Sequence, residues 1–218
     1  MKFKAVIFDL DGTLIDTLDD LADSMNNVLR NAGFPIHEKD KYKYFVGDGM
    51  KNLVKRALPI GNYEDSVIEA YLSQMKFEYS KNWKVKSKPY PGIPELLDSL
   101  EQTKIPKAVL SNKAHEFTVQ VINELLPKWH FDFVFGERLG ITRKPDPRGA
   151  LEIARSLGIK PCDILYVGDT STDMKTALNA GMYAVGVLWG FREKPELLEY
   201  GAAVTIAHPS ELIDLIQV

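Results

Sequence analysis

Residues 4–13 have the sequence Lys-Ala-Val-Ile-Phe-Asp-Leu-Asp-Gly-Thr, and the expected fold is built outward from this stretch. Ala5 to Phe8 is apolar and rich in β-branched and aromatic residues, which predicts a buried strand. A buried parallel strand is apolar on both faces, so the carboxylates of Asp9 and Asp11 at its end need a separate reason. In open α/β sheets, ligands bind just beyond the carboxyl ends of the strands. We therefore expect Asp9 and Asp11 to hold a hard cation and to act on a phosphate group.

The composition is ordinary for a folded protein: 45% of the 218 residues are hydrophobic and 26% are charged. The net charge of −3 gives no general attraction to nucleic acid or to an anionic membrane, so neither is expected as a partner. No apolar run approaches the ~20 residues of a membrane span, and Asp9 and Asp11 interrupt what would have to be a secretion signal. The single cysteine, Cys162, fits a reducing compartment. We expect a cytoplasmic protein.

The residues after Thr13 change to helical periodicity. Apolar residues recur at intervals of three and four from Leu14 to just before Gly33. Further helical patterns follow at 38–45, 53–58 and 63–82. No convincing strand lies in this stretch, which indicates a helical insert at 16–83, about the size of a small bundle. Because the insert leaves the predicted sheet just after Asp11, where a ligand would bind, we expect it to act as a cap.

The rest of the chain alternates between strands and helices. Predicted strands lie at 107–110, 131–135, 164–167, 184–187 and 203–206, and predicted helices lie at 93–102, 114–126, 147–157, from about 173 to 180, and 209–217. This alternation indicates a parallel sheet with right-handed crossovers. The expected fold is α/β, with a doubly wound, Rossmann-like core made of residues 1–15 and 84–218 and the helical cap inserted between them.

Polar residues follow three of the predicted strands, and a lysine lies in another loop. These residues are Asp9, Asp11, Ser111, Asn112, Lys144, Asp169 and Asp173. Since the carboxyl ends of parallel strands lie along one edge of a sheet, residues far apart in sequence can meet there. One aspartate at a strand end is more often a cap than a ligand, but three clusters at separate strand ends favour a site.

The residue types indicate a magnesium-dependent reaction at phosphorus. Asp9 and Asp169 are hard oxygen donors of the kind that Mg²⁺ prefers, and no Cys/His cluster suits zinc. No histidine follows a strand beside a nucleophile, whereas a carboxylate can itself attack phosphorus. We expect Asp9 to attack and Asp11 to act as general acid and then as base. Phosphate oxygens would be bound by Lys144 and by the donors of three further residues, namely Ser111, Asn112 and Gly12.

Four motifs resemble those of the haloacid dehalogenase superfamily, in particular its phosphatases. They are Asp-x-Asp-Gly-Thr at 9–13, Ser111 after the second core strand, Lys144 before proline, and Gly-Asp-x-x-x-Asp at 168–173. The resemblance spans essentially the whole chain and includes a helical cap after the first motif.

The resemblance to this superfamily also implies roles for the aspartates. Asp9 would be the nucleophile and Asp11 the general acid and base. Mg²⁺ would lie on the carboxylates of Asp9 and Asp169 and on the backbone carbonyl of Asp11, while Asp173 would orient the surroundings of the metal. The presence of Asp11 argues against the dehalogenase branch, which lacks the second aspartate.

Three stretches resemble phosphoglycolate phosphatases: Val46–Gly49 followed by 53–58, Lys88–Gly92, and Gly186–Arg192. The β-phosphoglucomutase branch usually has Arg-x-x-Ser-Leu in its cap, which Lys55-Arg56-Ala57-Leu58 does not match. A phosphomutase is therefore a less favoured alternative, and pyrophosphatases and sugar-phosphate phosphatases stay open. A non-catalytic phosphate-binding regulatory module is the alternative from another class, although no catalytic position is missing.

The predicted cap contains the turn Gly47-Asp48-Gly49, which has two interpretations. It is either plain punctuation between helices or a loop that selects the leaving group. Asp48 in such a loop would repel a substrate carboxylate, as in phosphoglycolate. The expected partner is a small phosphorylated metabolite, and the sequence does not decide between a monomer and a homodimer.

Overall fold

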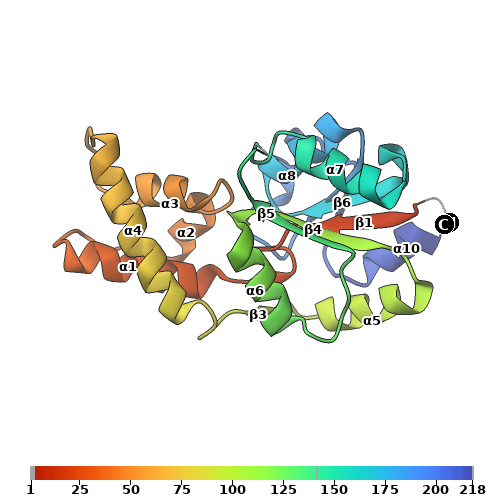
Figure 1. The fold of residues 1–218 in the computed structure, drawn as a ribbon, viewed down its shortest axis with the longest axis horizontal. Coiled ribbons are helices and arrows are strands. Elements are labelled where there is room, and N and C mark those ends of the chain that lie inside the picture. The colour runs from red at the N-terminus through yellow and green to blue at the C-terminus, as the bar shows by residue number, and fades with distance from the viewer. Residues whose placement is uncertain (1–2, 141, 218) are drawn as a thin grey trace. The chain divides into compact units, whose positions relative to one another are not determined.

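The computed structural model describes residues 3–140 and 142–217 and divides the chain into two compact units (Figure 1). The core unit comprises Met1–Ile15 and Pro89–Val218, and the helical unit comprises Asp16–Lys88. The chain passes from the core unit to the helical unit after Ile15 and returns to the core unit after Lys88. The helical unit thus includes residues 84–88, of which Lys86 and Ser87 hydrogen-bond to Asp20.

The core unit is a six-stranded sheet whose paired strands all run parallel, in the order β5-β4-β1-β6-β7-β8. The strands are β1 (Ala5–Phe8), β4 (Lys107–Ala114), β5 (Phe133–Glu137), β6 (Ile164–Gly168), β7 (Tyr183–Val187) and β8 (Val204–Ile206). From β1 the chain first adds β4 and β5 on one side, and then adds β6, β7 and β8 on the other. The order of strands therefore reverses at β1, and ligands of open α/β sheets bind at such a switch point. The predicted fold class is confirmed.

Helices pack on both faces of this sheet (Figure 1). One face carries α7 (Arg148–Leu157) and α8 (Ser171–Ala180), and the other carries α5 (Ile93–Thr103), α6 (His115–Leu125) and α10 (Glu211–Gln217). All four β1 side chains are buried, and Ala5 and Ile7 share a core cluster with Ile153 of α7 and Met174 of α8. A strand covered on both faces explains why the opening stretch is apolar without alternation.

The helical unit contains α1 (Leu18–Asn31), α2 (Lys39–Phe45), α3 (Met50–Ala57) and α4 (Asp65–Asn82). Met25, Tyr42 and Met75 are fully buried in it. The buried carboxylate of Asp20 accepts hydrogen bonds from the backbone N–H groups of Lys86 and Ser87, at 2.8–3.0 Å. These bonds fix the last residues of the unit against α1.

Several local features differ from the sequence-based expectation. The first helix begins at Leu18 rather than at Leu14, because Ile15–Asp16 forms a short strand, β2, that pairs with β3 (Lys88–Pro89). Strand β4 continues past Leu110 to Ala114, with a shift of register between these two residues. A short helix, α9 (Lys194–Glu199), and a 3₁₀ turn at Pro161–Asp163 were not predicted, and Cys162 in that turn is exposed.

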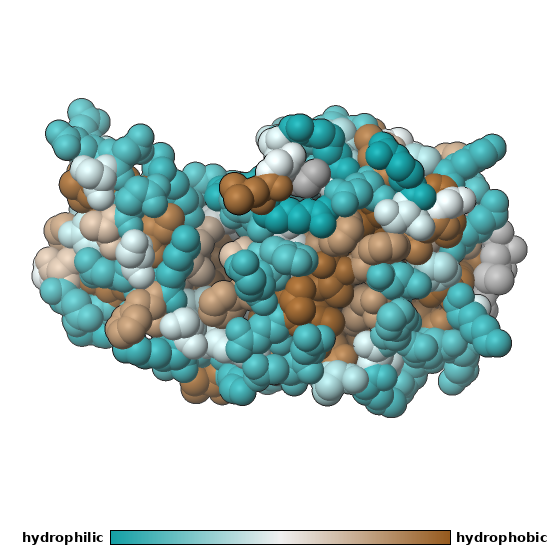
Figure 2. Space-filling view, in the orientation of Figure 1, coloured by the Kyte–Doolittle hydropathy of each residue, from teal (hydrophilic) through white to brown (hydrophobic). Residues whose placement is uncertain are grey.

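Hydrophilic side chains cover most of the surface visible in Figure 2, with smaller apolar areas between them. Within residues 3–140 and 142–217, none of the helices has the length and apolar character that a membrane span requires.

Candidate active site

Three buried carboxylates meet at the carboxyl end of the sheet. Asp9 directly follows β1, Asp169 directly follows β6, and Asp173 lies in the first turn of α8. Each offers an oxygen atom, and these atoms all lie within 4.8 Å of one another. Since β1 and β6 are neighbours, with Phe8 opposite Val167, the residues that follow them are brought together. Asp9 and Asp169 are thus brought together although 160 positions separate them in the sequence.

Lys144 lies between two of these carboxylates. Its Nζ is 2.8 Å from Oδ1 of Asp9 and 2.7 Å from Oδ1 of Asp173, and its side chain is buried. The side chain of Asn112 holds the backbone of Lys144, because Oδ1 accepts from the Lys144 N–H at 2.8 Å and Nδ2 donates to the Lys144 carbonyl at 3.1 Å. Asn112, which the sequence suggested as a phosphate ligand, therefore also positions the loop that carries the lysine.

The cluster has more negative charge than its lysine offsets. Burial, and then the charge of Asp173, raise the pKa of Asp9 well above its usual range. The same two causes raise the pKa of Asp169 to about 7. Burial opposes the charge on Lys144, but Asp173 and Asp9 outweigh burial and raise its pKa well above the usual value. Hard oxygen donors with excess negative charge fit a divalent cation such as Mg²⁺.

Asp169 is held in place by groups that sequence reasoning had not singled out as parts of a site. Its Oδ1 accepts a hydrogen bond from Thr13 Oγ1 at 3.1 Å, and its Oδ2 accepts one from the Phe191 N–H at 2.8 Å. Gly12 has φ +85°, and a Cβ on it would lie 2.3 Å from Asp169 Oδ2. The Gly-Thr pair after the two aspartates is therefore explained by the close approach of Asp169.

One expected phosphate donor is used elsewhere. The N–H of Gly12 donates to the carbonyl of Ile15 at 2.9 Å, closing the turn after β1. The Gly12 N–H is thus engaged in this turn, and its assignment to phosphate binding stays a prediction.

Asp173 has both carboxylate oxygens engaged. Oδ1 accepts from Lys144, while Oδ2 accepts from the backbone N–H and the hydroxyl of Thr170, at 3.1 and 2.6 Å. The bond from the Thr170 N–H is part of a capping box at the start of α8. Asp173 thus fixes the loop after β6 as well as the lysine.

The side chain of Asp11 does not join the three carboxylates. Both of its oxygens contact Lys113 Nζ, at 2.9 and 3.2 Å. Lys113 directly follows Ser111 and Asn112, yet sequence reasoning gave it no role, because a lysine after a strand resembles any surface charge. Ser111 is buried, and its hydroxyl accepts from the Lys113 N–H at 3.2 Å.

The Gly47-Asp48-Gly49 turn lies in the helical unit and is stabilised by residues of that unit. Arg56 forms an ion pair with the carboxylate of Asp48 and donates to the Phe45 carbonyl at 3.1 Å. The amide of Asn52 donates to the Asp48 carbonyl at 3.1 Å. Arg56 therefore offsets part of the negative charge of Asp48 within the helical unit.

A hollow of about 640 Å³ lies elsewhere in the helical unit. Its lining is Asp19, Asp20, Ala22, Asp23, Asn26, Asn27, Arg30, Ile36, His37, Glu38, Lys39, Asn82, Val85 and Lys86. None of the residues expected in the site lines it.

Known proteins are similar to this chain in sequence and in structure. The family of haloacid dehalogenase-like hydrolases matches residues 6–187. The phosphoglycolate phosphatase of Aquifex aeolicus is 30% identical, with 97% of this chain and 96% of the relative covered. The N-acetylmuramic acid 6-phosphate phosphatase of Pseudomonas aeruginosa is also 30% identical, with 99% and 96% covered. A crystal structure from Lactobacillus delbrueckii subsp. bulgaricus, of a protein proposed to be a phosphoglycolate phosphatase, is 32% identical with a TM-score of 0.93 and 99% of each chain covered.

The chain therefore belongs to the haloacid dehalogenase-like hydrolases, and its predicted place among the phosphatases of this family is confirmed. Within the family it resembles phosphoglycolate phosphatases over nearly its full length, as the three stretches indicated, and the phosphomutase alternative is not favoured.

Proposed function

We propose that this enzyme hydrolyses a small phosphate monoester through an aspartyl phosphate on Asp9, with Mg²⁺ as cofactor. The observation that carries the proposal is the position of Asp9. It follows the central strand, contacts Lys144 at 2.8 Å and shares its surroundings with Asp169 and Asp173. A carboxylate placed among cation ligands can approach an anionic phosphate that it would otherwise repel.

The residues present fit a magnesium ion. The carboxylates of Asp9 and Asp169, with the backbone carbonyl of Asp11, would hold it, and Asp173 would orient its surroundings through Lys144. When bound, the ion supplies positive charge that offsets the repulsion between Asp9 and the phosphate.

The reaction then proceeds in two displacements. The Asp9 carboxylate attacks phosphorus, the bond from phosphorus to the ester oxygen breaks, and Asp11 gives that oxygen a proton. Asp11 next takes a proton from water, whose oxygen attacks phosphorus, and the bond to Asp9 breaks to release inorganic phosphate. The Lys144 ammonium, the Ser111 hydroxyl and the Asn112 N–H would bind the transferring phosphoryl oxygens.

We infer that 2-phosphoglycolate is the most favourable substrate among small phosphorylated metabolites. This inference is supported by the names of the relatives. A relative of equal identity acts on an N-acetylated sugar-acid phosphate, so a substrate panel needs sugar phosphates too. Selection by the Gly47-Asp48-Gly49 turn stays a prediction.

The test is Asp9→Asn, which keeps the shape of the side chain but removes the nucleophile. Its phosphate release should fall to background for every ester of the panel, while its circular dichroism matches the wild type. Asp40→Asn, an exposed aspartate of the helical unit, is the matched control and should keep full activity. Substantial Mg²⁺-dependent turnover by Asp9→Asn would contradict the proposal.

The same panel separates the alternatives. A phosphomutase would need a bisphosphate activator and release little free phosphate. A wild-type protein that releases phosphate from no ester would instead favour the non-catalytic regulatory module.

A further inference from the structure

Lys113 is a nearly buried cation that the reaction above does not use. Its Nζ contacts both carboxylate oxygens of Asp11, at 2.9 and 3.2 Å, and the two side chains are only 6% and 14% exposed. Exposed ion pairs contribute little to stability, whereas a buried ammonium has lost much of its hydration. The burial of this charge is therefore better explained by a functional role of Lys113 than by stability alone.

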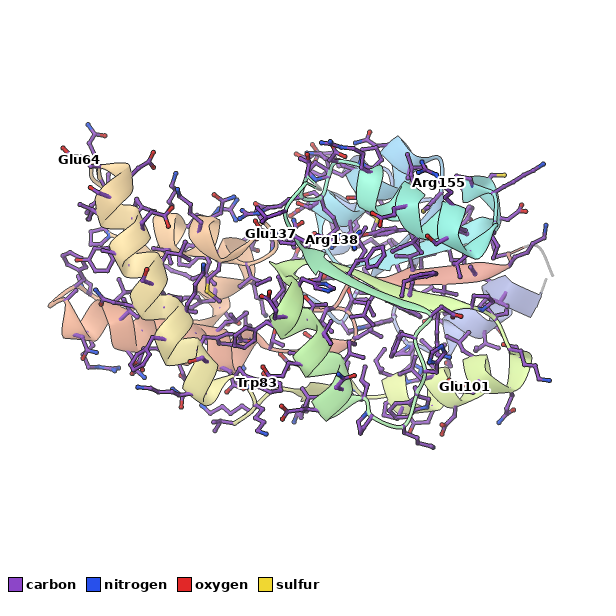
Figure 3. All side chains as sticks on the ribbon, viewed as in Figure 1. Glu64, Trp83, Glu101, Glu137, Arg138 and Arg155 are labelled. Atoms are coloured by element: carbon purple, nitrogen blue, oxygen red, sulfur yellow. The ribbon has the colours of Figure 1, made fainter. Side chains whose placement is uncertain are left out.

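The backbone holds Lys113 firmly at this edge of the sheet. Its N–H donates to Ser111 Oγ at 3.2 Å, and its carbonyl accepts from Thr118 Oγ1 at 3.2 Å. Strand β5 approaches so closely that a Cβ on Gly136 would lie 2.5 Å from the Lys113 carbonyl oxygen. Figure 3 labels Glu137 at the end of β5, and in register this residue lies opposite Ala114, directly after Lys113. The ammonium is thus presented by the irregular end of β4 and not by a surface loop.

The position of Lys113 relative to Asp11 fixes which part of a substrate it can reach. A general acid lies roughly 2.6–3.2 Å from the oxygen that it protonates. The leaving oxygen would therefore lie beside the Asp11 carboxylate, which is also where Lys113 Nζ lies. A group one or two bonds from the leaving oxygen comes within reach of the ammonium. In 2-phosphoglycolate, the carboxylate carbon is two bonds from that oxygen.

We propose that Lys113 determines specificity by pairing with a carboxylate carried next to the ester oxygen of the substrate. Its ammonium would exchange part of its contact with Asp11 for this carboxylate, in a charge-assisted hydrogen bond. Lys144, which is paired with Asp9 and Asp173, remains available for the phosphoryl group. The enzyme would then prefer the phosphate esters of 2-hydroxy acids to those of plain alcohols. The proposal rests on the proposed function, since it uses Asp11 as the group beside the leaving oxygen.

The test compares two substrates on Lys113→Met in the full-length enzyme with Mg²⁺. The substrates are 2-phosphoglycolate and ethyl phosphate, in which a methyl group replaces the carboxylate. Removing one partner of a buried charge pair should lower kcat/KM for 2-phosphoglycolate by about 100-fold or more, and for ethyl phosphate by less than about 10-fold. Lys113→Arg, which keeps the charge, should retain most of the wild-type preference.

The matched control is Lys107→Met. Lys107 is a buried lysine at the start of the same strand, paired with Glu101 at 2.7 Å. Its replacement should leave the ratio of the two kcat/KM values unchanged. Circular dichroism checks folding, and Lys113→Gln serves as the charge-free variant if Lys113→Met does not fold.

Equal losses on both substrates in the charge-free variant would overturn the proposal, because Lys113 would then act only by positioning Asp11. A wild-type enzyme that hydrolyses ethyl phosphate as well as 2-phosphoglycolate would also overturn it while leaving the proposed function intact. Failure of the proposed function is distinct from both results, since the wild type would then release phosphate from neither ester.

Discussion

At the residue scale, the charge balance of the site depends on Lys144. Two of its contacts are buried carboxylates at 2.7 and 2.8 Å, and Asp169 adds a third negative charge nearby. If Lys144 is removed, the negative charges of Asp9 and Asp173 are left buried without a compensating cation. Lys144 therefore stabilises the metal-free protein as well as contributing to the proposed chemistry.

Lys144→Met should lower the free energy of unfolding of the metal-free protein by about 3–5 kcal/mol. Urea denaturation at pH 7 with a chelator measures this loss. Lys128→Met removes an exposed lysine that is paired with Asp98, and it should have a much smaller effect. Equal losses in the two variants would show that Asp9 and Asp173 do not depend on Lys144 for compensation.

Part of this site was predictable residue by residue. Asp9, Asp169 and Lys144 were expected together, because residues that follow neighbouring parallel strands share one edge of the sheet. The bond from Thr13 to Asp169 and the pairing of Lys113 with Asp11 were not expected. Each of these contacts joins two residues more than 100 positions apart. A local pattern in the sequence therefore cannot predict them.

At the scale of elements, the sequence predicted the longer helices and the core strands, and missed the shortest pieces. A strand of two residues, such as Ile15–Asp16, is too short to show a period. Leu14 fits the helical spacing of the apolar residues that follow, but its backbone N–H donates a hydrogen bond to the Leu10 carbonyl in the turn after β1. That carbonyl also accepts from Thr13 and Ile15, so the first motif is a tight turn whose conformation depends on Gly12.

Gly12→Ala should both destabilise the protein and abolish activity. Gly12 has φ +85°, and the added Cβ would overlap the carboxylate of Asp169. The matched control is Gly181→Ala, at φ +69° with no atom within 4 Å of the added Cβ. The control should lose about 1 kcal/mol and keep its turnover. Urea denaturation and phosphate release measure both effects, and similar behaviour of the two variants would contradict the importance of the close approach at Asp169.

At the scale of the whole molecule, the buried carboxylates make global stability depend on pH. An unfolded aspartate has a pKa of about 3.9, whereas folding raises the pKa of Asp169 to about 7. Between these values the folded state binds more protons than the unfolded state, so the free energy of unfolding falls as the pH rises. The raised pKa of Asp9 acts in the same direction.

We expect the metal-free wild type to lose more stability between pH 5 and pH 7 than Asp169→Asn, which cannot titrate at this position. The difference should be on the order of 2 kcal/mol. Chemical denaturation at both pH values, with a chelator present, measures it. The same pH dependence in both proteins would mean that the pKa of Asp169 is not raised.

Magnesium should reverse this trend, since it binds the folded state and needs deprotonated ligands. The rise in Tm on adding Mg²⁺ should be larger at pH 8 than at pH 5, and it should be strongly reduced in Asp169→Asn. Thermal unfolding with and without the ion measures both. A rise that is equal at the two pH values would argue against a carboxylate site.

The strand order also determines how this protein can be assembled during synthesis. Residues 5–8 leave the ribosome before the other strands of the sheet, since their partners in β4 begin at Lys107 and those in β6 end with Val167. At a synthesis rate of roughly 5–20 residues per second, β6, the second neighbour of β1, is complete on the order of 10–30 s after β1. The helical unit, made of one continuous segment, has all of its residues much sooner. The strand that leads to Asp9 is thus the first part of the sheet to be made, and it has to be kept from pairing wrongly until most of the enzyme exists.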